Sequence, residues 1–189
     1  DADHRFKYYY GPSFQLMGSA ACRNFGFYRS KGDYIQFLDD DDLISGQKIE
    51  LQVMALEIDN PNAIVTCEWD KFDFHKDDRP SQWLDIYRNF DNVDEFLISL
   101  SYCHTYMPIH TYLLPRRLIL SSGCWNETLK INQDGEFMCR VFTKMSKVIF
   151  APGAKAYYRQ QSKNKISSLN SSIKIKHARN SWNLIENHF

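Results

Sequence analysis

Four consecutive aspartates, residues 39–42, place more carboxylates together than any other four-residue stretch of the sequence. They directly follow residues 34–38, whose largely apolar character predicts a strand covered on both faces. Adjacent carboxylates repel one another, and a hard divalent cation with oxygen ligands is the simplest compensation. The pattern therefore indicates a Mg²⁺ or Mn²⁺ site that also takes substrate phosphate. The alternative is a solvated acidic loop in which Asp42 stabilises the start of the next helix.

Strands alternate with helices along the chain, which is typical of an α/β fold with a mainly parallel sheet. Predicted strands cover residues 6–10, 34–38, 64–69, 110–114, 147–150 and 157–158. Predicted helices cover residues 19–30, 46–59, 93–100, 115–120, 133–145 and 173–188, and residues 70–91, 121–132 and 163–172 are predicted loops. Ser19 is the expected N-cap of the first helix. Because open α/β sheets bind ligands at the carboxyl ends of their strands, residues 34–38 should present the aspartates to a substrate.

The composition is that of one globular domain, and it excludes several classes of protein. The chain has 189 residues, 43% of them hydrophobic, with 23 basic against 23 acidic side chains. A zero net charge gives no support to a nucleic-acid partner, and no stretch approaches the roughly 20 apolar residues that span a bilayer. The five cysteines are widely spaced, which excludes a Cys-x-x-Cys motif and favours free thiols in a reducing cytosol.

Several motifs, in the right order, resemble those of the family 2 glycosyltransferases of GT-A fold. Residues 18–26 read G-S-A-A-C-R-N-F-G, similar to a glycine/serine entry and an A-R-N-x-G helix. Residues 31–42 read K-G-D-Y-I-Q-F-L-D-D-D-D, similar to the family's G-x-Y-I-x-F-L-D-x-D-D. The resemblance extends from about Phe6 to Ser168.

The downstream half carries further matches. Residues 108–117 resemble the segment that leads to the family's acceptor helix, and G-C-W-N-E at 123–127 resembles its G-G-F-D-E turn. Q-D-G-E-F at 133–137, followed by Arg140, resembles E-D-x-D-F followed by L-R. Residues 157–168 resemble the Y-Y-R…S segment that closes the family's domain.

The resemblance implies a three-layer, Rossmann-like GT-A domain. Family members begin with a strand, a helix and a strand that cradles the nucleotide base, and nothing here matches that half-site. We therefore expect the domain to be incomplete at its N-terminus. The expected domain covers residues 1–172, and residues 173–189 form an amphipathic helix that either packs on the domain or rests on an anionic membrane face.

The resemblance also gives the carboxylates separate roles. It implies that Asp41 binds the Mn²⁺ or Mg²⁺ ion, that Asp39 contacts the donor's ribose or supports the metal, and that Asp40 is a further donor contact. Asp134 matches the family's general base, which takes a proton from the acceptor hydroxyl as that hydroxyl attacks the anomeric carbon. The family's usual glutamate before this base is Gln133 here. The alternative for Asp134 is a carboxylate that stabilises the first turn of its helix.

Basic and aromatic residues complete the predicted site. The candidates are Arg23, Arg159, Lys163 and Lys165 for the donor, and His110 and Trp125 for the acceptor side. Arg23 either reaches the diphosphate or pairs with a strand-end carboxylate. Arg159 and the two lysines either fold over the diphosphate as a basic lid or belong to a solvated loop. A structural role for His110, and core packing for Trp125, are the alternatives.

The function implied is that of an inverting hexosyltransferase that uses a metal ion. It would move a sugar from a nucleotide-sugar, expected to be a UDP-sugar, to a saccharide or lipid-linked acceptor in surface polysaccharide or glycan synthesis. We expect it in the cytoplasm, at the inner face of the membrane if the last helix binds lipid. One alternative, a haloacid-dehalogenase-like phosphatase, requires Thr or Val where Leu43 and Ile44 stand. The other is a degenerate module that binds carbohydrate or a partner without turnover.

Overall fold

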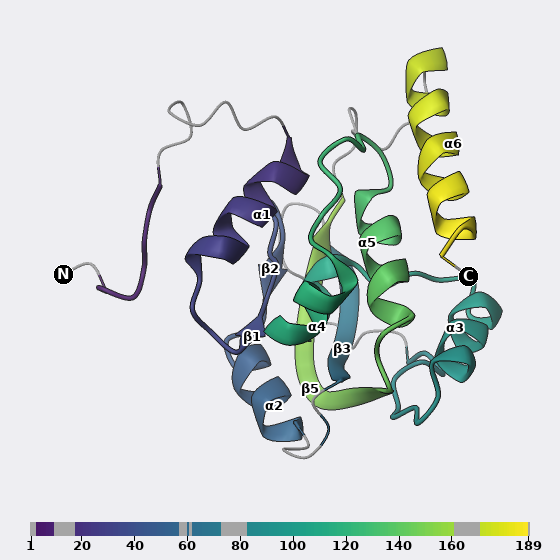
Figure 1. Cartoon of the computed structure of the whole chain (residues 1–189). Coiled ribbons are helices and arrows are strands. Elements are labelled where there is room, and N and C mark those ends of the chain that lie inside the picture. Colours follow the sequence, from purple (N-terminus) through teal and green to yellow (C-terminus); the bar gives the residue numbers. More distant parts are fainter. Residues whose placement is uncertain are drawn as a thin grey trace.

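The computed structural model describes residues 3–9, 18–56, 60, 62–72, 83–160 and 171–188 (Figure 1). Its helices are α1 (Ser19–Arg29), α2 (Lys48–Ala55), α3 (Val93–Tyr102), the 3₁₀ helix η2 (Ile109–Thr111), α4 (Arg116–Ser122), α5 (Gln133–Phe142) and α6 (Ser172–Glu186). Its strands are β1 (Tyr34–Ile35), β2 (Leu43–Ile44), β3 (Ala63–Phe72), β4 (Leu114–Pro115) and β5 (Lys147–Arg159). None of these helices is long and apolar enough to cross a membrane.

Two long parallel strands, β3 and β5, form the centre of the fold. They pair from Ala63 opposite Lys147 to Phe72 opposite Arg159, with one register shift between Thr66 and Glu68. The first residues of β3 are inaccessible to solvent, as expected of a strand covered on both faces. The α/β class and the parallel pairing predicted from the sequence are therefore confirmed.

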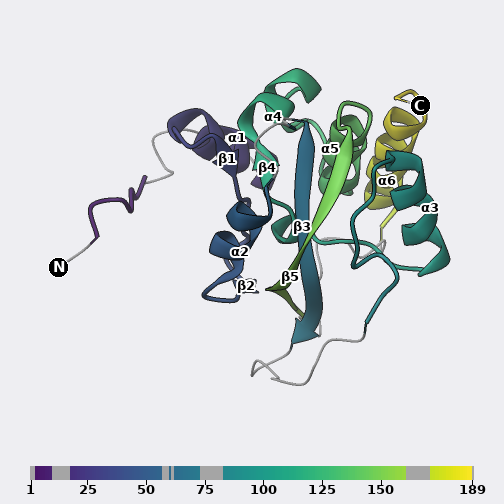
Figure 2. The same cartoon turned by 90° about the horizontal axis from the view of Figure 1, so that it is seen from below.

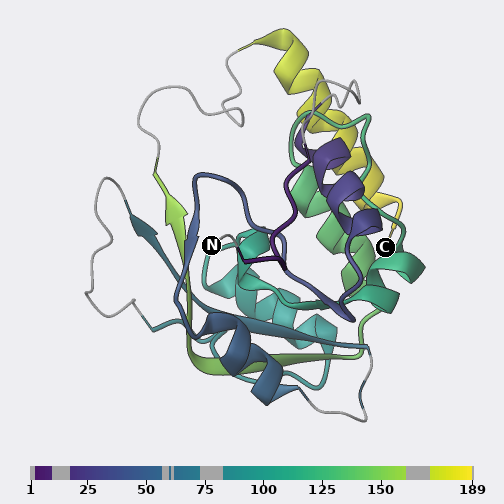
Figure 3. The same ribbon diagram turned by 90° about the vertical axis from the view of Figure 1, so that its left-hand side faces the viewer.

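Helices cover both faces of this pair, which makes three layers. Figure 3 shows α2 crossing over β3 and β5, and Figure 2 shows α3, α5 and α6 on the opposite side. Strand β2 extends this sheet by pairing antiparallel with β5, and β1 and β4 form a separate antiparallel pair. A single bridge between Val65 and Leu113 joins the two sheets. The carboxyl ends of β3 and β5 thus lie next to the segment that carries the aspartates.

The prediction that residues 34–38 form a central parallel strand is wrong. Only Tyr34 and Ile35 are in a strand, and they pair antiparallel with β4. Tyr34 lies opposite Pro115, which has no N–H to extend the ladder at that end. At the other end the Gln36 side-chain amide donates to the carbonyl groups of Phe37 and His110, at 2.6 and 3.0 Å. A side chain thus makes the bonds that a longer strand would have made.

Other boundaries also differ from the prediction. The helix expected at residue 19 begins there, but its N-cap is Gly18 rather than Ser19. The strand expected over residues 110–114 is wrong, because His110 lies in η2 and Leu114 starts the two-residue β4. The strands expected at 147–150 and 157–158 are one strand, β5, in which Gly153 has a φ of 80°. The other predicted helices are present, with ends shifted by a few residues.

Candidate functional site

A cavity of about 840 Å³ opens where α1, the aspartate run, η2, the start of α5 and the end of β5 meet. Among the predicted site residues, those that line it are Arg23, Asp39, Asp40, Asp41, His110, Asp134 and Arg159. Lys163 and Lys165 lie outside the described residues, so the basic-lid hypothesis stays a prediction. Residues far apart in the sequence therefore converge on one site, and we call this space the cleft.

Arg23 bonds to both the aspartate run and α5, which lie on either side of it in the cleft. One end of its guanidinium donates to both carboxylate oxygens of Asp39, at 2.6 and 2.8 Å, and the other end donates to Asp134, at 3.0 Å. The Arg23 side chain is 11% exposed, whereas the side chains of Asp39 and Asp134 are 38% and 49% exposed, so water screens these ion pairs in part. Of the two roles predicted for Arg23, the structure shows the pairing with a strand-end carboxylate.

The environment of Asp134 disfavours its charged form. Although 49% of this side chain is open to the cleft, the surrounding protein displaces enough water to raise its pKa above the ordinary value, and the negative charge of Asp39 raises it further. Arg23 and His110 oppose the shift. A carboxylate with a raised pKa accepts a proton more readily, which is what a general base requires.

Trp125 lies beneath the cleft rather than in it. Its ring is 3% exposed and stacks on Phe137, with the centroids 4.2 Å apart, while the Arg23 guanidinium lies 4.4 Å above the indole. Asn24 fixes this residue by bonding both its main-chain N–H and its carbonyl group, each at 2.9 Å. The structure thus places Trp125 in the core, where it supports Arg23, and not on an acceptor surface.

The four aspartates separate into different environments. Asp42 is 6% exposed, accepts the main-chain N–H of Arg159 at 2.9 Å, and has its other oxygen 2.9 Å from Nδ1 of His110. The His110 ring is inaccessible to solvent and lies parallel to Tyr158, although neither ring nitrogen has a well-aligned hydrogen bond among the described residues. Because α2 begins only at Lys48, the proposed role of Asp42 at a helix start is wrong.

Asp41 is the carboxylate whose surroundings most suggest a cation. Its pKa is raised above the ordinary value because it is partly buried and because Asp42, Asp40 and Asp39 add negative charge around it. Among the described residues no group of three carboxylate, histidine or cysteine side chains could hold a metal alone. Mg²⁺ sites commonly use one or two carboxylates together with water and substrate phosphates, so the oxygen donors present here fit Mn²⁺ or Mg²⁺.

A buried lysine supports the segment that leads to the aspartates. Lys48 is inaccessible to solvent, and its ammonium group donates to the side-chain oxygens of Gln36 and Gln52, both at 2.5 Å. The Gln52 amide then donates to the carbonyl groups of Val65 and Thr111, at 3.1 and 2.9 Å. Lys48 therefore ties the residues before Asp39 to β3 and to η2. Burial lowers its pKa to about 8.

This lysine makes stability depend on pH in a defined window. The unfolded chain keeps Lys48 protonated up to an ordinary pKa near 10.5, whereas the folded chain releases that proton near pH 8. Between these values the unfolded state binds more protons, so the free energy of unfolding rises with pH there. Relative to Lys48→Met, the free energy of unfolding of the wild type should rise by up to about 3 kcal/mol between pH 8 and pH 10.5. Urea unfolding of both proteins at several pH values measures this difference, and parallel curves would contradict it.

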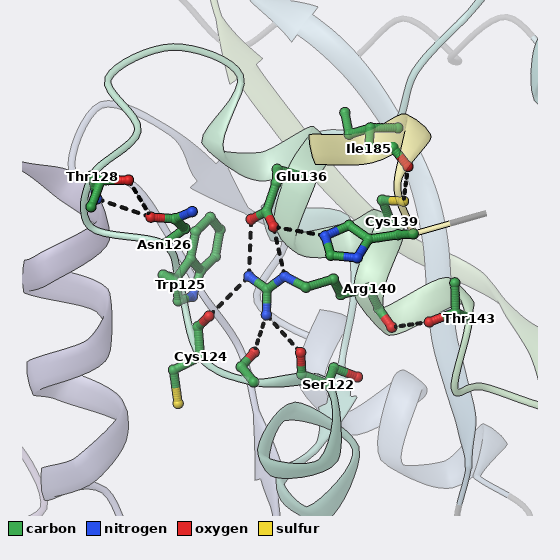
Figure 4. Close-up of polar contacts among 12 residues, drawn as sticks. Ser122, Cys124, Trp125, Asn126, Thr128, Glu136, Cys139, Arg140, Thr143 and Ile185 are labelled. Carbon is green, nitrogen blue, oxygen red and sulfur yellow. Dashed lines mark hydrogen bonds and ion pairs between the residues drawn. The ribbon is translucent and has the colours of Figure 1, made fainter. Parts of the chain in front are cut away.

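Glu136 and Arg140 of α5 form an ion pair with little exposure to solvent (Figure 4), and neither residue lines the cleft. Arg140 donates to both oxygens of Glu136, at 2.8 and 2.9 Å, and to the carbonyl groups of Ser122, Gly123 and Cys124, at 2.6 to 2.9 Å. Glu136 is 2% exposed and does not line the cleft. Glu136, the other carboxylate close to Asp134 in the sequence, therefore has a structural role.

Two aromatic residues of the cleft were missed by the sequence analysis. Tyr158 stacks beside His110, and Tyr106 packs edge-on to Tyr158 with the centroids 6.4 Å apart. Tyr158 belongs to the Tyr-Tyr-Arg motif, so a signal for it was present in the sequence. Tyr106 lies in no motif, and nothing but the fold brings it to the cleft.

Comparison with known proteins gives the class to which this site belongs. The model of glycosyl transferase family 2 matches residues 1–116, which is more than half of the chain, so the chain belongs to that family. The haloacid-dehalogenase alternative is thereby excluded. The family and the three-layer α/β structure agree with the GT-A-like domain predicted from the motifs.

Individual relatives cover parts of the chain. It is 47% identical over 53 residues to an uncharacterized glycosyltransferase of Haemophilus influenzae, covering 28% of this chain and 20% of that protein. It is 29% identical over 134 residues to an uncharacterized glycosyltransferase of Rickettsia typhi, covering 70% of this chain and 41% of that protein. The crystal structure of S. aureus TarS aligns over 73% of this chain and 24% of its own, with 14% identity and a TM-score of 0.45. The chain thus spans less than half the length of these relatives.

Proposed function

We propose that the chain carries the transfer site of an inverting, metal-dependent hexosyltransferase that takes its sugar from a nucleotide-sugar, with a UDP-sugar as the expected donor. The observation that carries this proposal is the meeting of Asp134, Arg23 and the aspartate run in one cleft. The pKa of the Asp134 carboxyl is raised, and Arg23 lies between this carboxyl and the carboxylates of the aspartate run. That is the arrangement a base and a diphosphate-binding site require.

The residues divide the work as follows. Asp41, supported by Asp39, would hold Mn²⁺ or Mg²⁺, which would stabilise negative charge on a departing diphosphate, and Asp40 would be a further contact to the donor. Asp39 would contact the ribose while Arg23 holds it in place. Arg159, whose Nε donates to the Asp41 carbonyl group at 2.7 Å, lies at the rim where a diphosphate would enter. Tyr158 would form the wall on the acceptor side, and the His110 ring, which is inaccessible to solvent, would support Tyr158.

The proposed stereochemistry follows from how the carboxylates near Asp134 are engaged. Retention through a covalent intermediate needs a second carboxylate as nucleophile near the anomeric carbon. Glu136 is bound by Arg140 on another face of α5, both oxygens of Asp39 are bound by Arg23, and Asp40 and Asp41 are assigned to the donor and its metal ion. Asp134 would therefore take the proton of an acceptor hydroxyl that attacks directly, which turns an α-linked donor into a β-glycoside.

Replacing Asp41 by asparagine tests the donor and metal part of the proposal. We expect wild-type protein to bind UDP in the presence of Mn²⁺, to release UDP from a UDP-hexose, and to lose both activities with a chelator. Asp41→Asn should weaken Mn²⁺-dependent UDP binding by about 100-fold or more, since it removes a direct ligand. Calorimetric titration with UDP and Mn²⁺ measures this, with thermal unfolding as the check that the fold survives.

The matched control is Asp33→Asn, which removes an exposed carboxylate outside the cleft and should leave UDP affinity unchanged. Equal affinity in the wild type and Asp41→Asn would remove Asp41 from the site. UDP binding without release from any UDP-hexose would favour the alternative of a binding module without turnover.

The contact with a membrane also stays a proposal. Helix α6 packs on α5, where the amide of Asn132 donates to the buried Ser181 at 3.3 Å. Its other face leaves Ile175 and Trp182 exposed beside Lys176 and Arg179. Both interpretations offered by the sequence are thus compatible with this helix, and a role in surface polysaccharide synthesis at the inner face of a membrane rests on the same proposal.

A further inference from the structure

A second pocket lies outside the cleft, at the end of α3. It has a volume of about 420 Å³, and its most exposed aromatic side chains are Trp83, at 65%, and Tyr102, at 81%. Asp85, Arg88 and Ser99 supply polar groups to its wall. We call it the outer pocket, and none of the residues assigned to transfer lines it.

The indole of Trp83 is held in place although most of it faces solvent. It packs edge-on against Tyr87 and Phe150, with centroid distances of 5.7 and 6.0 Å. Tyr87 is itself fixed, because it stacks on Phe150 and its hydroxyl group bonds the main-chain N–H and carbonyl of Trp69, both at 3.1 Å. An exposed aromatic ring on a rigid support loses little conformational freedom when a ligand stacks on it.

The outer pocket is joined to the cleft by the segment that follows α3. Tyr102 and Cys103 line the outer pocket, while Thr105 and Tyr106 line the cleft. The Tyr106 ring packs between the buried Trp69 and Tyr158, with centroid distances of 5.1 and 6.4 Å. The two pockets are therefore lined by neighbouring residues of one chain segment, with Tyr102 on the outer pocket and Tyr106 on the cleft.

The chemistry of the outer pocket fits a neutral, hydroxyl-rich ligand with apolar faces. Aromatic rings stack on the C–H faces of sugars, and Asp85, Arg88 and Ser99 offer both donors and acceptors to hydroxyl groups. One acidic and one basic side chain give the pocket no net charge, so it does not select a phosphate or another anion. A volume of this size lies within the range of small-molecule sites and accepts one or two sugar rings.

We propose that the outer pocket binds the distal sugars of an oligosaccharide acceptor whose terminal hydroxyl group lies at Asp134. This rests on the proposed function, and it narrows the acceptor from any saccharide to an oligosaccharide long enough to reach both Asp134 and the outer pocket. Sugars bound in both places would orient the acceptor along the segment between α3 and η2.

The test is binding of the full chain to a microarray of bacterial surface oligosaccharides of graded length. We expect wild-type protein to bind longer oligosaccharides more tightly than the monosaccharide with the same terminus. Trp83→Ala and Tyr102→Ala should each lower that affinity about tenfold, since a stacked ring face is lost. Because both side chains are exposed, neither change should impair folding, which thermal unfolding checks.

The matched control is Trp182→Ala, which removes an exposed tryptophan of α6 and should leave glycan binding unchanged. Absence of binding to any oligosaccharide, or equal binding by the wild type and Trp83→Ala, would overturn the proposal. UDP affinity and UDP release from a UDP-hexose should be the same in the wild type and Trp83→Ala. A failure of the outer pocket alone therefore leaves donor binding intact, whereas a failure of the proposed function removes donor binding in every variant.

Discussion

Asp134→Asn is expected to lower turnover by about 10²–10⁴-fold, the usual contribution of general base catalysis. Asparagine keeps the shape of the side chain and can still accept a hydrogen bond from Arg23, but it cannot take a proton. Because Arg23 keeps its two bonds to Asp39, affinity for UDP should change little. Initial rates at saturating donor, and the KM for the donor, measure the two effects separately.

The pH profile and the product give independent checks on Asp134. A general base works in its ionised form, so we expect the wild-type rate to fall as pH falls through the pKa of Asp134, which lies above the ordinary aspartate value. This acid limb should be absent from the residual activity of Asp134→Asn. Asp91→Asn, at a side chain that is 88% exposed, is the matched control and should behave as the wild type. A product with retained anomeric configuration, detected by NMR, would mean that Asp134 has a different role.

Arg140→Ala should have the largest effect on stability, a loss of about 3–5 kcal/mol in the free energy of unfolding. The change leaves the Glu136 carboxylate buried without its cation and removes the donor shared by the carbonyl groups of Ser122, Gly123 and Cys124 (Figure 4). A carboxylate stripped of its partner in a low-dielectric interior is costly, because water cannot replace the lost interaction. Urea unfolding monitored by tryptophan fluorescence measures the loss.

The double variant separates the buried charge from the lost carbonyl bonds. Glu136→Gln combined with Arg140→Ala removes the uncompensated carboxylate and should recover part of the stability that Arg140→Ala loses. The bond between His188 Nε2 and Glu136, at 3.3 Å, does not substitute for Arg140, since it reaches only one carboxylate oxygen. A loss below about 1 kcal/mol for Arg140→Ala would show that water or rearranged neighbours satisfy these groups.

The helices were predictable because their signals are local. Apolar spacing predicted α3 and α5 to within a few residues, and the motif around Arg23 predicted α1. The strands depended on partners that the sequence does not reveal. Residues 34–38 have the composition of a buried strand, yet Pro115 opposite Tyr34 and the side-chain bonds of Gln36 limit the strand to two residues.

The interruption in β5 shows the same dependence on context. Residues 147–150 and 157–158 were predicted as two separate strands, and the sequence between them contains Pro152-Gly153, a pair typical of turns. In the structure the residues between Phe150 and Lys155 leave the ladder opposite Cys67, and the chain then resumes pairing with β3. A β-bulge within one strand and a turn between two strands can have the same local sequence, and only the pairing with the partner strand distinguishes them.

For the site, the sequence indicated which residue types would meet but not how they share their bonds. The motifs predicted that Asp39, Asp134 and Arg23 belong to one site, and all three line the cleft in the structure. They did not indicate that Asp42 is buried against His110 and the end of β5, because adjacent aspartates look equivalent in a sequence. Nor did any local pattern mark Lys48, whose burial depends on two glutamines from different elements.

The pairing of β3 with β5 also has a consequence for how the chain reaches its native state. Ala63 pairs with Lys147, 84 positions further along the chain. The two central strands can therefore pair only after the long loop between them has closed. Closing so long a loop costs entropy before any contact repays it, and rates of folding decrease as contacts become less local. Refolding from urea should therefore be slower than in a helical bundle of equal length. Until the two strands meet, the apolar edge of β3 is open to pairing with other chains, which makes aggregation during refolding the main competing reaction.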